Sequence, residues 1–195
     1  MESISKWWRY SVLIVIAVGF SVLGFVTKLT YENAPPVPLK VVDPSNNLVF
    51  SGDHISNGQN LFFKYNLMEL GTLWGHGAYL GPDFSAEYLH QETGVIRDLL
   101  SRNIFGVAFD NLSEKDRGTV SHLVIQMIKQ NRYDPATQTL IYSEEQIAAF
   151  QEAVQYWSQY FKEGAPGQPA NYIQDPQELH DLTAFFPGLP GPRVL

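Results

Sequence analysis

The stretch KYNLMELGTLWGHGAYLGPDFSAEYLH, residues 64–90, is the most informative part of the chain. It places four glycines, at positions 71, 75, 77 and 81, between two segments with helical patterns. Glycine permits backbone conformations and close approaches that other residues do not. Asp83 follows Pro82, and this pair is suited to begin a helix. The sequence therefore predicts a tight glycine-rich loop between a helix that ends near Tyr65 and one that begins at Asp83.

The residues on either side of this loop repeat at helical spacing. Asp53 is suited to cap a helix that runs to about Tyr65. The apolar residues that would bury one face of this helix and of the next are Ile55, Leu61, Phe62, Tyr88, Val95, Ile96 and Leu99.

Further helix starts follow along the chain. Ser113 with Asp116, and Ser143 with Gln146, have the spacing of capping boxes. Asp175 before a proline is suited to begin a last short helix. The apolar stripes behind these starts are Val120, Leu123, Val124, Met127 and Ile128, then Ile147, Phe150, Val154, Trp157 and Phe161, then Leu179, Leu182, Phe185 and Phe186. Residues 132–142 predict a short hairpin or loop. We therefore predict a mainly α domain with a minor hairpin.

Residues 10–29 read YSVLIVIAVGFSVLGFVTKL, and their only charge is Lys28. A helix of this length crosses about 30 Å of hydrocarbon, at about 1.5 Å per residue. Lys6 and Arg9 precede it, which favours an N-terminus on the inside, although Lys28 weakens this inference. We predict a retained single-pass transmembrane anchor with the bulk of the chain outside the cytoplasm. A cleaved signal peptide is the alternative.

The predicted organisation has four parts. Residues 1–31 form the membrane anchor, and residues 32–50 form a proline-rich linker. Residues 51–186 form the domain, and residues 187–195 form a proline- and glycine-rich tail.

The composition excludes several function classes. The chain has 13 Lys and Arg against 20 Asp and Glu, a net charge of −7, so nucleic-acid phosphates would be repelled. It has no cysteine. Disulfides, thiolate metal ligands, iron–sulfur clusters and the covalent attachment of c-type haem are therefore excluded.

The central stretch nevertheless resembles a cytochrome c. In the membrane-anchored cytochrome c subunit of bacterial nitric oxide reductases, a Tyr-Asn-Cys-x-x-Cys-His motif precedes Gly-Glu-Gly-Ala-Tyr and then Pro-Asp or Pro-Glu. Here the same frame reads Tyr65-Asn66, then residues 75–79 as GHGAY, then Pro82-Asp83. Together with the anchor WWRYSVLIVIAVGFSVLGF, the pattern is similar to the N-terminal region of quinol-dependent nitric oxide reductases. The resemblance implies a cytochrome c-like all-α domain without haem.

The haem attachment residues of that frame are replaced. Leu67 and Leu70 stand at the two cysteine positions, and Gly71 stands at the position of the axial histidine. Leucine forms no thioether and glycine offers iron no lone pair. We expect the two leucines to fill part of the volume that a porphyrin would occupy.

The resemblance implies a role in the reduction of two NO to N2O and water with electrons from quinol. The catalytic partner would be a haem–copper-oxidase-type membrane domain or subunit with haem b, haem b3 and non-haem iron. None of its histidine and glutamate ligands is present here, so this chain would be a structural domain that is not catalytic alone. It would be either a truncated product or a separate subunit. Its expected place is the bacterial cytoplasmic (inner) membrane.

The resemblance also suggests site residues. His76, Gly77, Tyr79 and Asp83 are expected at the interface with the catalytic partner, and Gly77 and Tyr79 lie where relatives hold calcium through backbone oxygens. The simpler interpretations are a loop histidine, a packing glycine, a core tyrosine and a helix cap.

Two other functions remain open from sequence. A membrane-anchored binding or interaction module could use the groove vacated by haem for a small ligand. The isolated chain could also bind haem noncovalently, which a Soret band would reveal.

Overall fold

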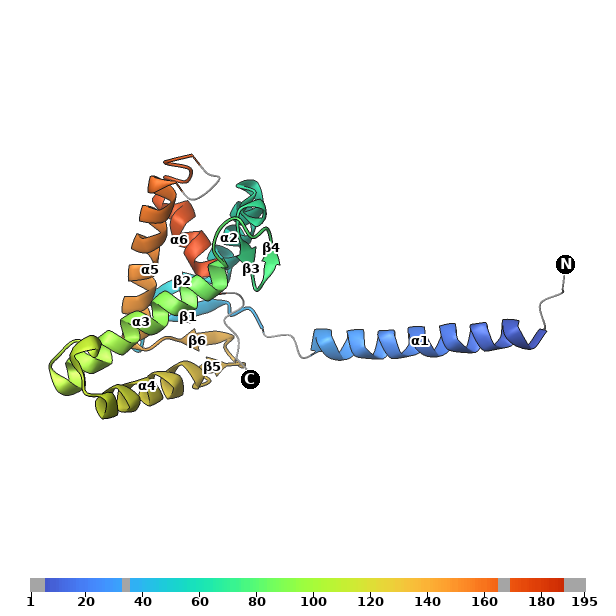
Figure 1. The fold of residues 1–195 in the computed structure, drawn as a ribbon, viewed down its shortest axis with the longest axis horizontal. Helices are drawn as coiled ribbons and strands as arrows, with labels where there is room; N and C mark the ends of the chain where they lie inside the picture. Colours follow the sequence, from blue (N-terminus) through green and yellow to red (C-terminus); the bar gives the residue numbers. More distant parts are fainter. Residues whose placement is uncertain (1–5, 33–35, 165–168, 188–195) are drawn as a thin grey trace. The chain divides into compact units, whose positions relative to one another are not determined.

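A computed structural model describes residues 6–32, 36–164 and 169–187 and divides the chain into two compact units, residues 1–35 and 36–195 (Figure 1). The predicted linker at residues 32–50 lies partly outside the described residues, as does most of the predicted tail at residues 187–195.

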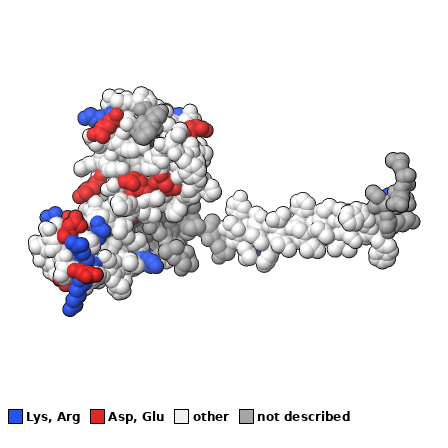
Figure 2. All heavy atoms as spheres, viewed as in Figure 1, with Lys and Arg blue, Asp and Glu red and all other residues white. Residues whose placement is uncertain are grey.

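The first unit contains one long helix, α1 (Lys6–Glu32). Within Trp7–Glu32, the most apolar window of 18 residues has a mean hydropathy of 2.4, so the helix is long and apolar enough to cross a membrane. Its surface carries almost no charge (Figure 2). The hydroxyl groups of Ser11, Ser21 and Thr30 donate hydrogen bonds to the carbonyl oxygen four residues earlier, which satisfies these polar groups within the helix itself.

The second unit is mainly α, as predicted. Its helices begin at side-chain caps that the sequence indicates: Asp83 accepts a hydrogen bond from the Ala86 N–H, Ser113 from Asp116 and Ser143 from Gln146. The helices are α2 (Gly52–Lys64), α3 (Phe84–Phe105), α4 (Glu114–Lys129), α5 (Glu144–Glu163) and α6 (Pro176–Phe185), with short 3-10 helices η1 (Leu67–Glu69) and η2 (Phe109–Asn111).

The start of α2 differs from the prediction. Its N-cap is Ser51, and Asp53 lies inside the first turn. The His54 ring reaches back so that its Nδ1 accepts the Ser51 backbone N–H at 2.9 Å. Ser51 therefore takes the capping position two residues before the expected one.

The unit also contains a small sheet with the strand order β2-β1-β6-β5. The predicted hairpin at residues 132–142 is present, as β5 (Tyr133–Asp134) and β6 (Thr139–Ile141). The sequence did not indicate β1 (Lys40–Val42) and β2 (Leu48–Ser51), and β1 pairs parallel with β6. Residues assigned to the linker thus belong to the folded unit, because Val41 and Phe50 are buried in its core.

Two clusters of buried side chains hold the unit together. The larger one gathers aromatic residues from α2, α3, α5 and α6, and the smaller one is aliphatic and lies between α3, α4 and α5. Helix α3 joins them, because Phe84 and Tyr88 belong to the first cluster and Ile96 to the second. A two-stranded hairpin, β3 (Thr72–Leu73) and β4 (His76–Gly77), lies between η1 and α3.

Candidate functional site

The segment between α2 and α3 has a buried side built from the residues that replace the haem attachment motif. Leu67 begins η1 and is 0% exposed, and Leu70 is half-buried against the same cluster. Gly71 is buried as well. A Cβ atom at residue 71 would lie 2.4 Å from the Pro82 carbonyl oxygen and 2.8 Å from Cε2 of Phe84. Position 71 therefore has no room for any side chain, and still less for an imidazole.

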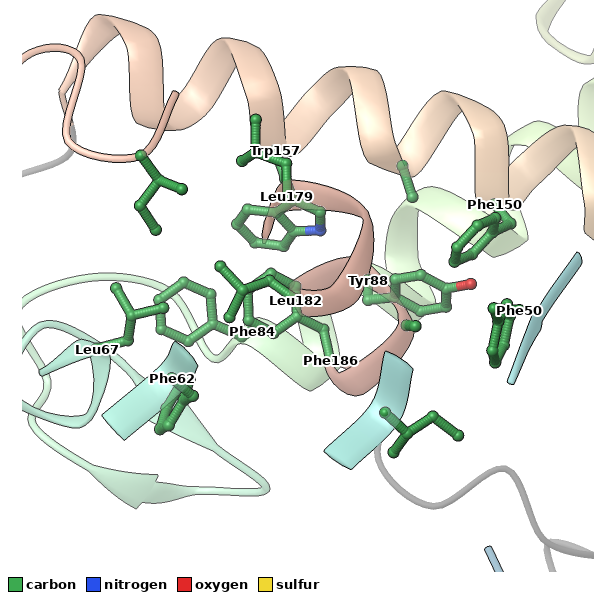
Figure 3. Packing of buried hydrophobic residues seen from close by; sticks show 14 of the residues in the cluster. Phe50, Phe62, Leu67, Phe84, Tyr88, Phe150, Trp157, Leu179, Leu182 and Phe186 are labelled. Atoms are coloured by element: carbon green, nitrogen blue, oxygen red, sulfur yellow. The ribbon is translucent and has the colours of Figure 1, made fainter. Parts of the chain in front are cut away.

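Aromatic rings fill the volume next to these residues (Figure 3). Phe84 is at the centre: it stacks on Phe186 with ring centroids 4.9 Å apart and meets Phe62 edge-on at 5.7 Å. The Trp157 indole lies 5.4 Å from the same ring. Aromatic pairs at these separations add to the stability that burial alone provides.

This arrangement does not fit a covalently attached haem. The chain offers no sulfur and no axial nitrogen at positions 67, 70 and 71, and the space beside them is packed with side chains. Leu67 is fully buried and Leu70 is half-buried, and Phe84 with its aromatic neighbours fills the interior beside them.

Asp83 connects the β3–β4 hairpin to the start of α3. One of its oxygens, Oδ1, accepts the Ala86 N–H at 2.8 Å. The other, Oδ2, accepts the Thr72 hydroxyl at 2.7 Å and the Gly75 N–H at 2.6 Å. The predicted helix cap is thus present, and the same carboxylate also fixes the turn of the hairpin.

These hydrogen bonds change the acidity of Asp83. Partial burial by itself raises the pKa of the carboxyl group. The hydrogen bonds from Ala86, Thr72 and Gly75 outweigh burial, and the net pKa lies below the ordinary value of 3.8. The charged carboxylate is therefore the form that stabilises this loop.

Gly77 serves close packing within the loop. Its φ of +139° suits glycine, and a Cβ atom there would lie 2.3 Å from the Gly71 carbonyl oxygen. The next residue, Ala78, donates its N–H to the Met68 carbonyl oxygen at 2.8 Å. The absence of a side chain at Gly77 therefore allows β4 to lie in close contact with η1.

The opposite side of the segment is exposed and partly apolar. Tyr79 is 86% exposed, so it is not the core tyrosine of the simpler interpretation, and His76 is exposed as well. The structure adds Trp74, 55% exposed, and Leu80, neither of which the sequence singled out. We call Trp74, His76, Tyr79 and Leu80 the outer face.

Trp74 adopts an unusual backbone conformation. Its φ is +55°, and that of Gly75 is +75°, as in the two-residue turns that match the twist of a hairpin. This conformation is unfavourable for a bulky residue and costs on the order of 1–3 kcal/mol. The hydrogen bond from the Gly75 N–H to Asp83 helps to hold it.

The described residues of the loop do not form a complete calcium site. Calcium takes six to eight oxygen ligands, whereas both oxygens of Asp83 already accept hydrogen bonds from the protein. Among the described residues, no group of three or more carboxylate or histidine side chains lies beside Gly77 or Tyr79. Backbone oxygens are therefore the ligands that this loop would offer calcium by itself.

The sequence was compared with known proteins. No curated protein matches it. A family model for the NorB cytochrome c-like domain of nitric oxide reductase matches residues 38–187. This range contains the whole described part of the second unit except its first two residues. The chain therefore belongs to the family of NorB cytochrome c-like domains of nitric oxide reductase.

Proposed function

We propose that the chain is the extracytoplasmic, structural domain or subunit of a quinol-dependent nitric oxide reductase. Family membership associates it with nitric oxide reductase. In the proposed arrangement, α1 anchors it in the bacterial inner membrane, and the domain docks onto a haem–copper-oxidase-type catalytic partner that carries haem b, haem b3 and non-haem iron.

The observation that supports this proposal most strongly is the packing at Gly71. A cytochrome c frame with leucine at positions 67 and 70 and a closely packed glycine at position 71 has no group there to hold iron. Electrons would then enter the reductase elsewhere. Quinol within the membrane supplies two electrons and two protons, and the overall reaction, 2 NO + quinol → N2O + H2O + quinone, balances without a cytochrome c.

The outer face is the proposed docking surface. Aromatic side chains are over-represented among the residues that dominate binding energy at protein interfaces, and Trp74 and Tyr79 stand exposed on one hairpin and the chain that follows it. Trp74 has a strained backbone conformation. Residues with such strain are found more often at functional sites than elsewhere. His76 and Gly77 lie on the same hairpin, and Asp83 fixes its turn.

The binding-module alternative receives less support. It requires a groove where haem would lie, and that volume is filled by Leu67, Phe62 and Phe84 (Figure 3). Noncovalent haem would need the same space.

The test uses the full chain with an affinity tag, coexpressed with a candidate haem b-containing catalytic subunit. We expect the chain purified alone to show no Soret band, and the tagged chain to retain the haem b-containing subunit after solubilisation in detergent. Replacement of Trp74 by Ser and Tyr79 by Ala should abolish retention, whereas Ile125→Ser, an exposed apolar position on α4, should not. A redox-active haem in the chain itself, or no retention of the haem b-containing subunit by the unaltered chain, would refute the proposal. Retention that survives the outer-face variant would refute the outer face as the docking surface.

A further inference from the structure

Helices α2 and α6 approach each other closely on a side of the unit that the proposed function does not use. A Cβ atom at Gly58 of α2 would lie 2.2 Å from the Asp181 carbonyl oxygen of α6, so only glycine allows this approach. His54 lies one turn before Gly58. The crossing therefore brings His54 beside His180, with ring centroids 5.1 Å apart.

A carboxylate completes this cluster. His54, His180 and Asp181 each offer one ligand atom, and these atoms all lie within 4.8 Å of one another. The Asp181 side chain is buried, with the whole residue only 5% exposed. Nδ1 of His180 is buried too and has no hydrogen-bond partner among the described residues, and its closest acidic neighbour is Asp181 Oδ1 at 3.6 Å. A buried polar atom without a partner is unfavourable unless something else binds it.

The spacing fits a small tetrahedral ion. Zinc binds histidine nitrogen and carboxylate oxygen at about 2.0–2.2 Å, which places neighbouring ligands of a tetrahedron about 3.3–3.5 Å apart. The distance of 3.6 Å between His180 Nδ1 and Asp181 Oδ1 is close to this ligand–ligand spacing. All three ligand atoms already lie within 4.8 Å of one another, so side-chain rotation would bring them to this spacing.

Neighbouring groups hold the donors in place. Nδ1 of His54 lies 3.1 Å from the Ser51 hydroxyl as well as accepting the Ser51 N–H. Binding of a metal at Nε2 of His54 needs the other tautomer, in which Nδ1 carries the hydrogen. Nδ1 would then donate to the Ser51 hydroxyl and no longer accept the Ser51 N–H. The Gln177 side chain donates to Asp181 Oδ1 at 2.9 Å.

We propose that His54, His180 and Asp181 form a binding site for a divalent transition metal ion of the zinc class, with a fourth position open to water. His180 also lines an open groove of about 560 Å³, between the β1–β2 turn and α5, which gives an ion access from solvent. The ion would fasten the first turn of α2 to α6 and so stabilise the aromatic cluster between them. This site is independent of the docking surface.

The site is tested with the full chain in detergent after treatment with a chelator. Isothermal titration with Zn²⁺ should show one ion bound per chain, and Zn²⁺ in excess should raise the thermal midpoint. Co²⁺ in place of Zn²⁺ should give the intense visible absorption of a tetrahedral site. His54→Gln, His180→Gln and Asp181→Asn should each weaken Zn²⁺ binding by at least about 10-fold, the lower limit of what the loss of even an outer partner of a metal ligand costs.

His90→Gln and His122→Gln are matched controls, because both histidines are exposed, on α3 and α4. They should leave Zn²⁺ binding unchanged. Circular dichroism establishes which variants are folded, and the Co²⁺ spectrum of the unaltered chain does not depend on any variant. A lack of Zn²⁺ binding, a Co²⁺ spectrum typical of octahedral aquo coordination, or equal affinity in the His180 and His122 variants would overturn the proposal.

Discussion

The two sides of residues 67–83 differ in what they contribute. The inner side consists of Leu67, Leu70 and Gly71, and a Cβ atom at residue 71 would overlap the Pro82 carbonyl oxygen and the Phe84 ring. The outer face exposes Trp74, Tyr79 and Leu80. The cytochrome c motif attaches haem at this segment, whereas here its inner side packs into the fold and its outer face is the proposed docking surface.

The two sides can therefore be tested by different measurements. Changes on the inner side should alter the free energy of unfolding, because they affect close packing. Changes on the outer face should alter association and leave stability nearly unchanged.

Phe84→Ala should have the largest effect. Phe84 is fully buried and contacts Phe62, Trp157 and Phe186, so its loss should destabilise the domain by about 4 kcal/mol. Denaturant unfolding of the full chain in detergent, followed by near-UV circular dichroism, measures this. Phe84→Leu should recover part of the loss. A cost below about 1 kcal/mol for Phe84→Ala would mean that the aromatic cluster does not stabilise the fold as argued.

Gly71→Ala should cost about 2–3 kcal/mol, because its Cβ would lie 2.4 Å from a backbone oxygen that cannot easily move. Gly94→Ala is the matched control, since a Cβ at this helical position meets nothing within 4 Å. That variant should gain about 0.5–1 kcal/mol from helix propensity. Unfolding of both variants under the same conditions gives the comparison, and equal stability would contradict the close packing at residue 71.

Much of this fold could be predicted from local signals. Ser113, Ser143 and Asp175 lie at helix starts because their side chains accept N–H groups that the first turn leaves unpaired. The strands β1 and β2 could not be predicted, because segments of three and four residues show little periodicity. The parallel pairing of β1 with β6 depends on residues far apart in the chain. Ser51 and Asp53 are both good caps, and only the position of the His54 ring distinguishes them.

The inner side of the candidate site was predictable more fully than the outer face, where the resemblance singled out His76 and Tyr79 but not Trp74 and Leu80. Leu67, Leu70 and Gly71 stand out because they occupy positions where a known motif has other chemistry. Trp74 and Leu80 do not stand out, because sequence alone rarely separates an exposed apolar residue from a buried one. Tyr79 illustrates the same limit: it looks like a core residue but lies in solvent.

Asp83→Asn should cost about 1–2 kcal/mol at pH 7. An amide can still cap α3, but its NH2 group would face the Gly75 N–H, which now donates to Oδ2. Since the folded pKa of Asp83 lies below 3.8, its stabilisation is present above this value and is lost as the pH falls through the folded pKa. The stability difference between the unaltered chain and the Asp83→Asn variant should therefore shrink below pH 3.8. Unfolding free energies measured at several pH values test this, and a constant difference would show that the charge of Asp83 is irrelevant.

The outer face should show the smallest change in stability and the largest change in association. Combined replacement of Trp74 by Ser, Tyr79 by Ala and Leu80 by Ser should shift the unfolding free energy by no more than about 0.5 kcal/mol per position, because these side chains are largely exposed. Serine keeps the same unfavourable φ at position 74, so relief of strain should add little stability. The same variant should lose the haem b-containing partner in a tag pull-down, while Ile125→Ser retains it. If the variant unfolds, the outer face belongs to the folded core, and if it folds but still binds, docking uses another surface. If the two sides of the segment have different roles, this one variant must lose association with the partner and keep its unfolding free energy.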